Sequence, residues 1–140
     1  MLRYFAYGSN MDDTQMARRC PDARLVGPAS LPDHRFFITG NGWASVRPDT
    51  SQSVWGLQWQ LSARDIEALD LWEDVENGLY TREQRRIIPR GGEPCDAMVY
   101  VECSLSSGDP PAWYIERIIT SAARHRLPEE YQQFLRGWMP

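Results

Sequence analysis

Stretches in which apolar residues dominate or alternate with polar ones predict several strands. Residues 2–7 (LRYFAY) are almost wholly apolar, which is typical of a short strand that is buried on both faces. Residues 54–61 place an apolar side chain at every second position from Trp55 to Leu61, the period of a strand with one buried face. Weaker patterns predict further extended segments at 35–39, 44–47, 80–88 and 97–102.

Capping and stop signals predict the helices between and after these strands. Asn10 can cap a helix that Pro21 stops. Ser62 with Asp65 resembles a capping box, and Asn77-Gly78 is a strong stop signal, so we expect a helix over 62–76. Two more helices are expected near the end of the chain, over 113–126 and from Pro128 onward.

The order of these elements predicts the fold class. A strand and a helix are followed by several short strands, a helix between strands, more strands, and then helices. Short and numerous strands favour a strongly curved sheet with helices outside it. We therefore expect an α+β fold, a small mixed β-barrel flanked by helices, formed by a single domain over residues 1–140.

The amino-acid composition argues against some classes of binding partner. A formal net charge of −4 gives no clustered positive surface for nucleic acid or anionic membranes, and no apolar run reaches the roughly 18–20 residues of a membrane span. No signal peptide is visible. Cys20, Cys95 and Cys103 are odd in number and lack CxxC spacing, which favours reduced thiols in a cytoplasmic protein without a metal site. His34 and His125, the two histidines, are too few for a catalytic Ser-His-Asp set.

Gly8-Ser9-Asn10, between the first strand and the first helix, has two interpretations. One is a turn followed by a helix cap. In the other, glycine lets the backbone approach a ligand, and unpaired N–H groups at the helix start hold a small carboxylate.

Glu73 is the second candidate. On a helical wheel it falls between Ile66 and Leu69, whereas Glu67, Asp70 and Asp74 fall together on the polar sector. A carboxylate at an apolar boundary tends to have a raised pKa, which suits a general acid/base near neutral pH. The alternative is a carboxylate at the rim of an amphipathic helix that reaches water.

Four segments resemble the γ-glutamylcyclotransferases, in the order in which that family has them. "YFAYGSNM" is similar to the family's N-terminal signature, and "VWGLQWQL" to the strand before its catalytic helix. "LDLWEDVENGLYTR" resembles its second signature, Leu-Asp-x-x-Glu followed by Gly-x-Tyr. "PPAWYIERIITSAARHRLPEEYQQFL" is similar to its C-terminal region. The resemblance runs from about residue 3 to residue 135.

The resemblance implies a small mixed β-barrel with a substrate cavity at its mouth. It implies an enzyme, a cyclising lyase or acyltransferase that releases 5-oxoproline from γ-glutamyl compounds, with no metal or organic cofactor. The partner would be a small γ-glutamyl molecule, and the protein a monomer or homodimer. The family's catalytic carboxylate falls on Glu73. Its substrate-binding positions fall on Tyr4, Phe5, Ala6, Tyr7, Gly8, Ser9, Asn10, Tyr80, Tyr100 and Tyr114.

Some points stay open at this stage. Asp74 stands where the family often has glycine; it could raise the pKa of Glu73 or simply face water. The segment before "VWGLQWQL" matches the family loosely, so the leaving group could be an amino acid, an amine or a biosynthetic intermediate. A non-catalytic module that binds a small molecule with the same fold is the alternative to an enzyme.

Overall fold

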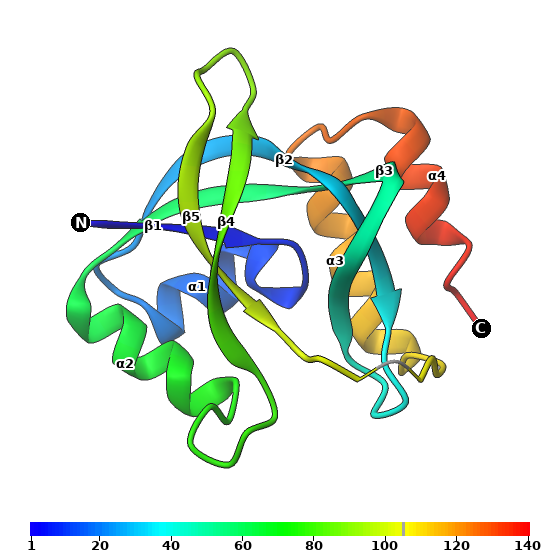
Figure 1. The fold of residues 1–140 in the computed structure, drawn as a ribbon, viewed down its shortest axis with the longest axis horizontal. Coiled ribbons are helices and arrows are strands. Elements are labelled where there is room, and N and C mark those ends of the chain that lie inside the picture. The colour runs from blue at the N-terminus through cyan, green and yellow to red at the C-terminus, as the bar shows by residue number, and fades with distance from the viewer. Residues whose placement is uncertain (105) are drawn as a thin grey trace.

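A closed five-stranded barrel forms the centre of the molecule (Figure 1). The computed structural model describes residues 1–104 and 106–140. Around the barrel the strands follow the order β1-β3-β2-β4-β5, and β1 closes it by pairing in parallel with β5 while the other pairs are antiparallel. The strands are β1 (Leu2–Ala6), β2 (Arg24–Ile38), β3 (Ala44–Leu61), β4 (Thr81–Pro89) and β5 (Cys95–Val101). The expected α+β fold with a mixed barrel is confirmed.

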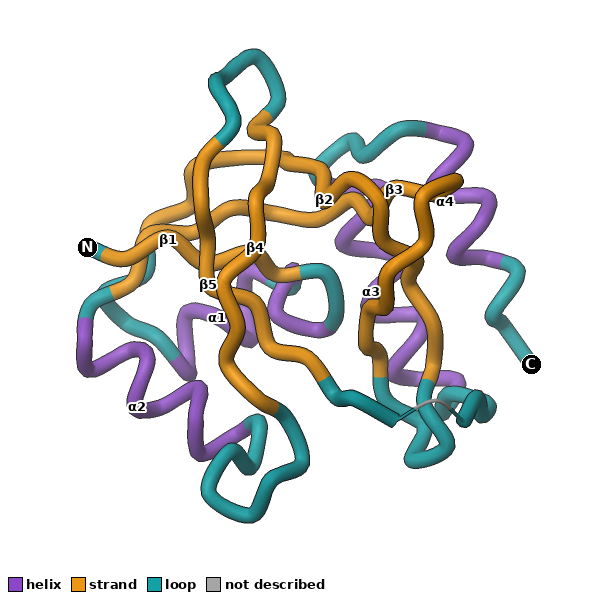
Figure 2. Tube along the Cα trace, viewed as in Figure 1, coloured by secondary structure: helices purple, strands orange, loops and turns teal. Residues whose placement is uncertain are grey.

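Helices cover the barrel on two sides (Figure 2). In this view α1 and α2 lie together below the first strand, and α3 and α4 pack against each other beside the far ends of β2 and β3. The helices are α1 (Asp13–Arg19), α2 (Ala63–Trp72), α3 (Ala112–Arg124) and α4 (Glu129–Arg136), with a 3-10 turn, η1 (Ser9–Met11), after β1. The two C-terminal helices expected from the sequence are confirmed.

The strands β2 and β3 are longer than the sequence pattern predicted. The short extended segments expected there belong to two strands of 15 and 18 residues. Their pairing shifts register at two places: Val26 is an extra residue in β2, and Asp33, whose φ is 60°, lies opposite residues 49–52 of β3. Irregularities of this kind bend a strand and increase its twist, so one long strand can curve around a barrel. Pro28 and Pro32 interrupt the alternation from which strands are predicted.

Helix α2 begins as expected and ends early. The Ser62 hydroxyl accepts from the Asp65 N–H, and the Asp65 carboxylate accepts from the Ser62 N–H, each at 3.1 Å, so the capping box is confirmed. The helix ends at Trp72 and not at 76, because Asp74 adopts a left-handed backbone with φ of 53°. Aspartate is one of the few residues besides glycine that tolerates this conformation. Glu73 is therefore the C-cap residue.

The first helix is capped by a residue other than the one expected. Asp12 is the N-cap of α1, and its carboxylate accepts the Gln15 N–H at 2.9 Å. Asn10 lies in η1 with its side chain buried, so it is not a helix cap. The Asn10 side chain instead forms hydrogen bonds with Tyr4 and Glu73.

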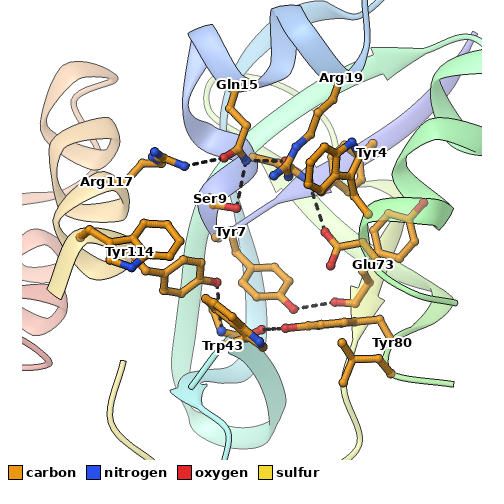
Figure 3. Close-up of a pocket in the computed structure, with 17 residues that line it drawn as sticks. Tyr4, Tyr7, Ser9, Gln15, Arg19, Trp43, Glu73, Tyr80, Tyr114 and Arg117 are labelled. Atoms are coloured by element: carbon orange, nitrogen blue, oxygen red, sulfur yellow. Dashed lines mark hydrogen bonds between the residues drawn. The ribbon is translucent and has the colours of Figure 1, made fainter. Parts of the chain in front are cut away.

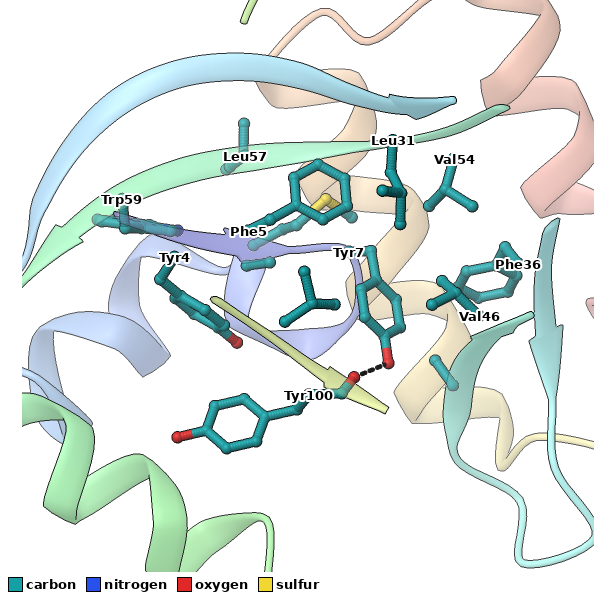
Figure 4. Packing of buried hydrophobic residues seen from close by; sticks show 14 of the residues in the cluster. Tyr4, Phe5, Tyr7, Leu31, Phe36, Val46, Val54, Leu57, Trp59 and Tyr100 are labelled. Atoms are coloured by element: carbon teal, nitrogen blue, oxygen red, sulfur yellow. Dashed lines mark hydrogen bonds between the residues drawn. The ribbon is translucent and has the colours of Figure 1, made fainter. Parts of the chain in front are cut away.

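The barrel interior is filled by aromatic and branched side chains (Figure 4). Phe5, Leu31 and Leu57 are fully or almost fully buried there. The Tyr7 hydroxyl donates a hydrogen bond to the backbone oxygen of Tyr100 at 2.5 Å, which ties the end of β1 to β5. The core thus extends to the point where the first strand gives way to η1.

Candidate active site

A cavity of about 280 Å³ lies where β1 and η1 meet the ends of α2 and α3 (Figure 3). It brings together residues that are more than 100 positions apart in the sequence. Its walls are formed by Tyr4, Tyr7, Gly8, Ser9, Asn10, Gln15, Arg19, Trp43, Ala44, Trp72, Glu73, Leu79, Tyr80, Tyr100, Trp113, Tyr114 and Arg117. The charged residues in this set are Arg19, Glu73 and Arg117.

The Gly8-Ser9-Asn10 turn forms one wall of the cavity. The carbonyls of Gly8 and Ser9 accept the first hydrogen bonds of the turn, from Met11 and Asp12. The N–H groups of Gly8, Ser9 and Asn10 precede these donors, and N–H groups at the start of a helical turn have no partner within it. A Cβ on Gly8 would lie 3.5 Å from the Tyr114 hydroxyl, so glycine leaves room in the cavity at this point.

Glu73 faces the same cavity from the end of α2 (Figure 3). Its side chain is half-buried, and burial raises its pKa from the ordinary 4.5 to about 7, against the opposing charge of Arg19. Near neutral pH the carboxyl group therefore exists in both protonation states, as a general acid/base requires. The carboxylate of the neighbouring Asp74 accepts from the Asn77 side chain at 2.7 Å. Burial is the leading cause of the raised pKa of Glu73.

The buried side chain of Asn10 connects the two walls. Its Nδ2 donates to the Tyr4 hydroxyl at 2.9 Å and to Oε1 of Glu73 at 3.4 Å. Its Oδ1 accepts from Gln15 at 2.9 Å and from Arg19 at 3.0 Å. The turn after β1 and the end of α2, 63 residues apart, are thus joined by a hydrogen bond at the cavity wall.

The five tyrosines expected from the sequence line the cavity, and three of them, Tyr80, Tyr100 and Tyr114, come from parts of the chain beyond β1. The Tyr80 hydroxyl donates to the Ala44 carbonyl at 2.6 Å, and the Ala44 N–H donates to the Tyr114 hydroxyl at 3.0 Å. The Tyr100 hydroxyl donates to the Asp70 carboxylate at 2.7 Å. Burial raises the pKa of each hydroxyl, so all three stay protonated and neutral.

Three expectations from the sequence are corrected here. Phe5 and Ala6 do not line the cavity; both are fully or almost fully buried in the core, on the strand just before the turn. Asp70, expected to face water, is half-buried and lies 3.4 Å from the guanidinium of Arg82 in addition to its bond with Tyr100. A helical wheel cannot show this, because the Arg82 side chain of β4 and the Tyr100 side chain of β5 reach Asp70 only in the tertiary structure.

Several cavity residues were not expected from the sequence. Arg19 lies over the ring of Trp72, 4.0 Å from its centroid, and Arg117 lies over Trp113 at 5.4 Å. Gln15 and Arg19 are four residues apart and so share one face of a helix, which is the signal that would have pointed to them as a pair. The two tryptophans carried no signal that distinguishes a cavity wall from core.

Neither a cluster of metal ligands nor a membrane-spanning helix is found among the described residues. Over 1–104 and 106–140, no group of three or more His, Cys, Asp or Glu side chains is arranged to hold a metal ion. Within the same residues, no helix has both the length and the apolar character that crossing a membrane requires.

Comparison with known proteins gives a consistent set of relatives. The mouse protein named γ-glutamylcyclotransferase is 29% identical over 98% of this chain and 78% of its own length, and the human protein of that name is 27% identical over the same shares. A solved γ-glutamyl cyclotransferase structure superposes with a TM-score of 0.92 at 26% identity, over 99% of this chain and 88% of that chain. The resemblance that the sequence motifs suggested is confirmed.

The chain also matches the sequence model of a protein family. The model of the AIG2-like family matches residues 53–135, which include α2, Glu73, α3 and all but the last residue of α4. Since this match spans more than half of the sequence, the chain belongs to the AIG2-like family.

Proposed function

We propose that this chain is a γ-glutamyl cyclotransferase, which converts a γ-glutamyl compound to 5-oxoproline and a free amine. The observation that carries the proposal is the position of Glu73, which faces the Gly8-Ser9-Asn10 turn across one cavity. The similarity to the mouse and human γ-glutamylcyclotransferases supports the same reaction. The leaving amine stays open among an amino acid, a simple amine and a biosynthetic intermediate.

The turn after β1 would bind the glutamyl α-carboxylate. Its N–H groups at Gly8, Ser9 and Asn10 meet the cavity at the start of a helical turn, where backbone donors favour an anion. The absence of a side chain at Gly8 lets a carboxylate approach this backbone closely. Holding the glutamyl chain folded in this way brings its α-amine within reach of its own γ-carbonyl, and such preorganisation supplies much of the rate of an intramolecular reaction.

Glu73 would transfer the proton during cyclisation. The α-amine, as the free base, attacks the γ-carbonyl carbon, and a new C–N bond forms as the carbonyl π electrons move to oxygen. Glu73 accepts the proton that the attacking nitrogen loses and donates it to the leaving nitrogen. The C–N bond to the leaving group then breaks, and the carbonyl of 5-oxoproline is restored. A pKa of about 7 suits both halves of this transfer.

Release of 5-oxoproline from a panel of γ-glutamyl dipeptides and γ-glutamyl amines tests the proposal. We expect turnover with at least one member, and a fall of about two to four orders of magnitude in Glu73→Gln, the usual contribution of a positioned acid/base. Asp74→Asn is the matched control, because it removes the neighbouring carboxylate, which bonds to Asn77. A folded Glu73→Gln protein with near wild-type turnover would falsify the role of Glu73.

The competing function is a module that binds a γ-glutamyl compound or 5-oxoproline without turning it over. The raised pKa of Glu73 favours the enzyme, since binding alone does not require a group that changes protonation near pH 7. Binding without product release across the whole panel would support the module instead.

A further inference from the structure

The side chain of Asn10 has every one of its polar atoms engaged. Its Oδ1 accepts from Nε2 of Gln15 at 2.9 Å and from a guanidinium nitrogen of Arg19 at 3.0 Å. Its Nδ2 donates to the Tyr4 hydroxyl at 2.9 Å and to Oε1 of Glu73 at 3.4 Å. The side chain is only 3% exposed, so reversing the amide would leave several buried groups facing like partners.

The orientation of this amide is set by groups that can only donate. The two ends of an amide have nearly the same shape, so their neighbours decide which end is nitrogen. Arg117 donates to Oε1 of Gln15 at 2.8 Å, and this turns the Gln15 NH₂ group toward Asn10 and toward the Ser9 hydroxyl, 3.0 Å away. Arg19 imposes the same orientation on Asn10 independently. An arginine has no acceptor atom with which a reversed amide could pair.

We propose that this network holds Asn10 with an N–H directed at Oε1 of Glu73, which leaves Oε2 as the oxygen that exchanges the proton. Gln15, Arg19 and Arg117 are then positioning residues that act on Glu73 through Asn10. This inference rests on the proposed function for its meaning in turnover, but the geometry can be tested without turnover.

The Asn10 N–H donor determines whether the pKa of Glu73 rises or falls when the network is lost. An N–H at Oε1 stabilises the charged carboxylate and directs protonation to the other oxygen. In the reversed orientation the amide oxygen would face Oε1 of Glu73, and two facing acceptors would keep the carboxyl group protonated to higher pH. Loss of the network should therefore raise the pKa of Glu73.

Other groups also influence the pKa of Glu73, and a suitable experiment leaves these groups unchanged. Burial is the largest influence, and Arg19 acts on it directly by its charge as well as through Asn10. Five tyrosine hydroxyls from several elements also interact with its charge: Tyr4, Tyr7, Tyr80, Tyr100 and Tyr114. Asp74 is its neighbour along the chain and bonds to Asn77, and Arg117 lines the same cavity. Gln15 is neutral and is not among these influences, so a neutral substitution there removes one of the two donors to Oδ1 of Asn10 and weakens its hold on that side chain, without changing the charge.

A double-mutant cycle isolates the path through Asn10. The pKa of Glu73 is measured from its side-chain carboxyl carbon by ¹³C NMR titration, with the signal assigned by its loss in Glu73→Gln. We expect Gln15→Met to raise that pKa by about 0.5 in the wild-type background, the size expected for a weakened hydrogen bond to a charged group. In the Asn10→Leu background the same substitution should have no effect, because the intermediary is gone.

Arg18→Gln is the control for the helix itself, because Arg18 is exposed and lies one residue from Arg19 on α1. It should leave the pKa of Glu73 unchanged. If Gln15→Met does not fold, Arg117→Met tests the same path from its far end, where the side chain is 39% exposed. No change of the Glu73 pKa in the wild-type background, or the same change in both backgrounds, would overturn the inference.

The experiments distinguish a failure of this network from a failure of the proposed function. Wild-type protein that releases 5-oxoproline but shows no effect of Gln15→Met contradicts the network alone. A protein that shows the coupled shift but turns over none of the γ-glutamyl panel contradicts the proposed function alone. Where both hold, Gln15→Met should move the acid limb of the kcat/KM profile to higher pH while the folded state stays intact.

Discussion

Glu73→Gln should make the folded protein more stable at neutral and alkaline pH, although it removes the proposed acid/base. The wild-type carboxyl group is half-buried, and burial raises its pKa from 4.5 to about 7 against the opposing effect of Arg19. Between these values the folded protein keeps a proton on Glu73 that the unfolded chain has already released. The free energy of unfolding of the wild type therefore falls as the pH rises through this window. Glutamine has no charge to bury, so the variant lacks this loss.

The magnitude follows from the two pKa values. Each pKa unit corresponds to about 1.4 kcal/mol, so a rise from 4.5 to about 7 sets an upper limit of about 3.4 kcal/mol. The carboxyl group borders a cavity that opens to solvent, and solvent screening reduces this figure. We expect the variant to gain about 1–2 kcal/mol at pH 8 and close to nothing at pH 4.5, where the carboxyl group is protonated in the folded protein.

Urea denaturation of both proteins at pH values from 4.5 to 8 measures this difference directly. Every other titrating group is common to the two proteins, so the difference between their free energies of unfolding reports Glu73 alone. A difference that is constant over the range, or a variant that is less stable than the wild type at pH 8, would refute the reasoning from burial. It would also remove the physical basis for a neutral-pH acid/base at this position.

Three further predictions concern the site and the barrel. If Glu73 must be ionised to accept the proton, kcat/KM should fall by an additional factor of about ten per pH unit below pH 7, beyond the fall caused by protonation of the substrate amine; a profile without a bend near pH 7 would contradict this. In NMR spectra, 5-oxoproline should shift the amide signals of Gly8 and Ser9 first; shifts confined to another part of the protein would argue against the turn as the carboxylate site. Gly56→Ala should lower the free energy of unfolding by about 1–3 kcal/mol, because its methyl group would overlap the Ala6 carbonyl in the barrel. An unchanged melting temperature would show that β1 and β3 separate more easily than their packing implies.

Local signals in the sequence determined the elements that depend on neighbours along the chain. The capping box at Ser62 and Asp65 is such a case, because its hydrogen bonds join residues three apart. The burial of Tyr4, Phe5 and Ala6 and the fold class followed from apolar patterning and the order of elements, but Leu2, in the same apolar run, is exposed. Four motifs in the family's order, among them those around Gly8 and Glu73, suggested the family, which the comparisons confirmed.

The tertiary structure alone decided what surrounds Glu73. The wheel placed it at an apolar boundary, but α2 ends before it, and the left-handed backbone of Asp74 sets the direction that the chain takes next. Asp12 caps helix α1 in place of Asn10, which was expected there, and the buried side chain of Asn10 instead forms a hydrogen bond with Glu73. Closure of the barrel brings these residues together across 63 positions, and no pattern of neighbours encodes a contact at that separation. The free energy that closes the barrel comes from burying the whole core, so the site exists only once the barrel has closed.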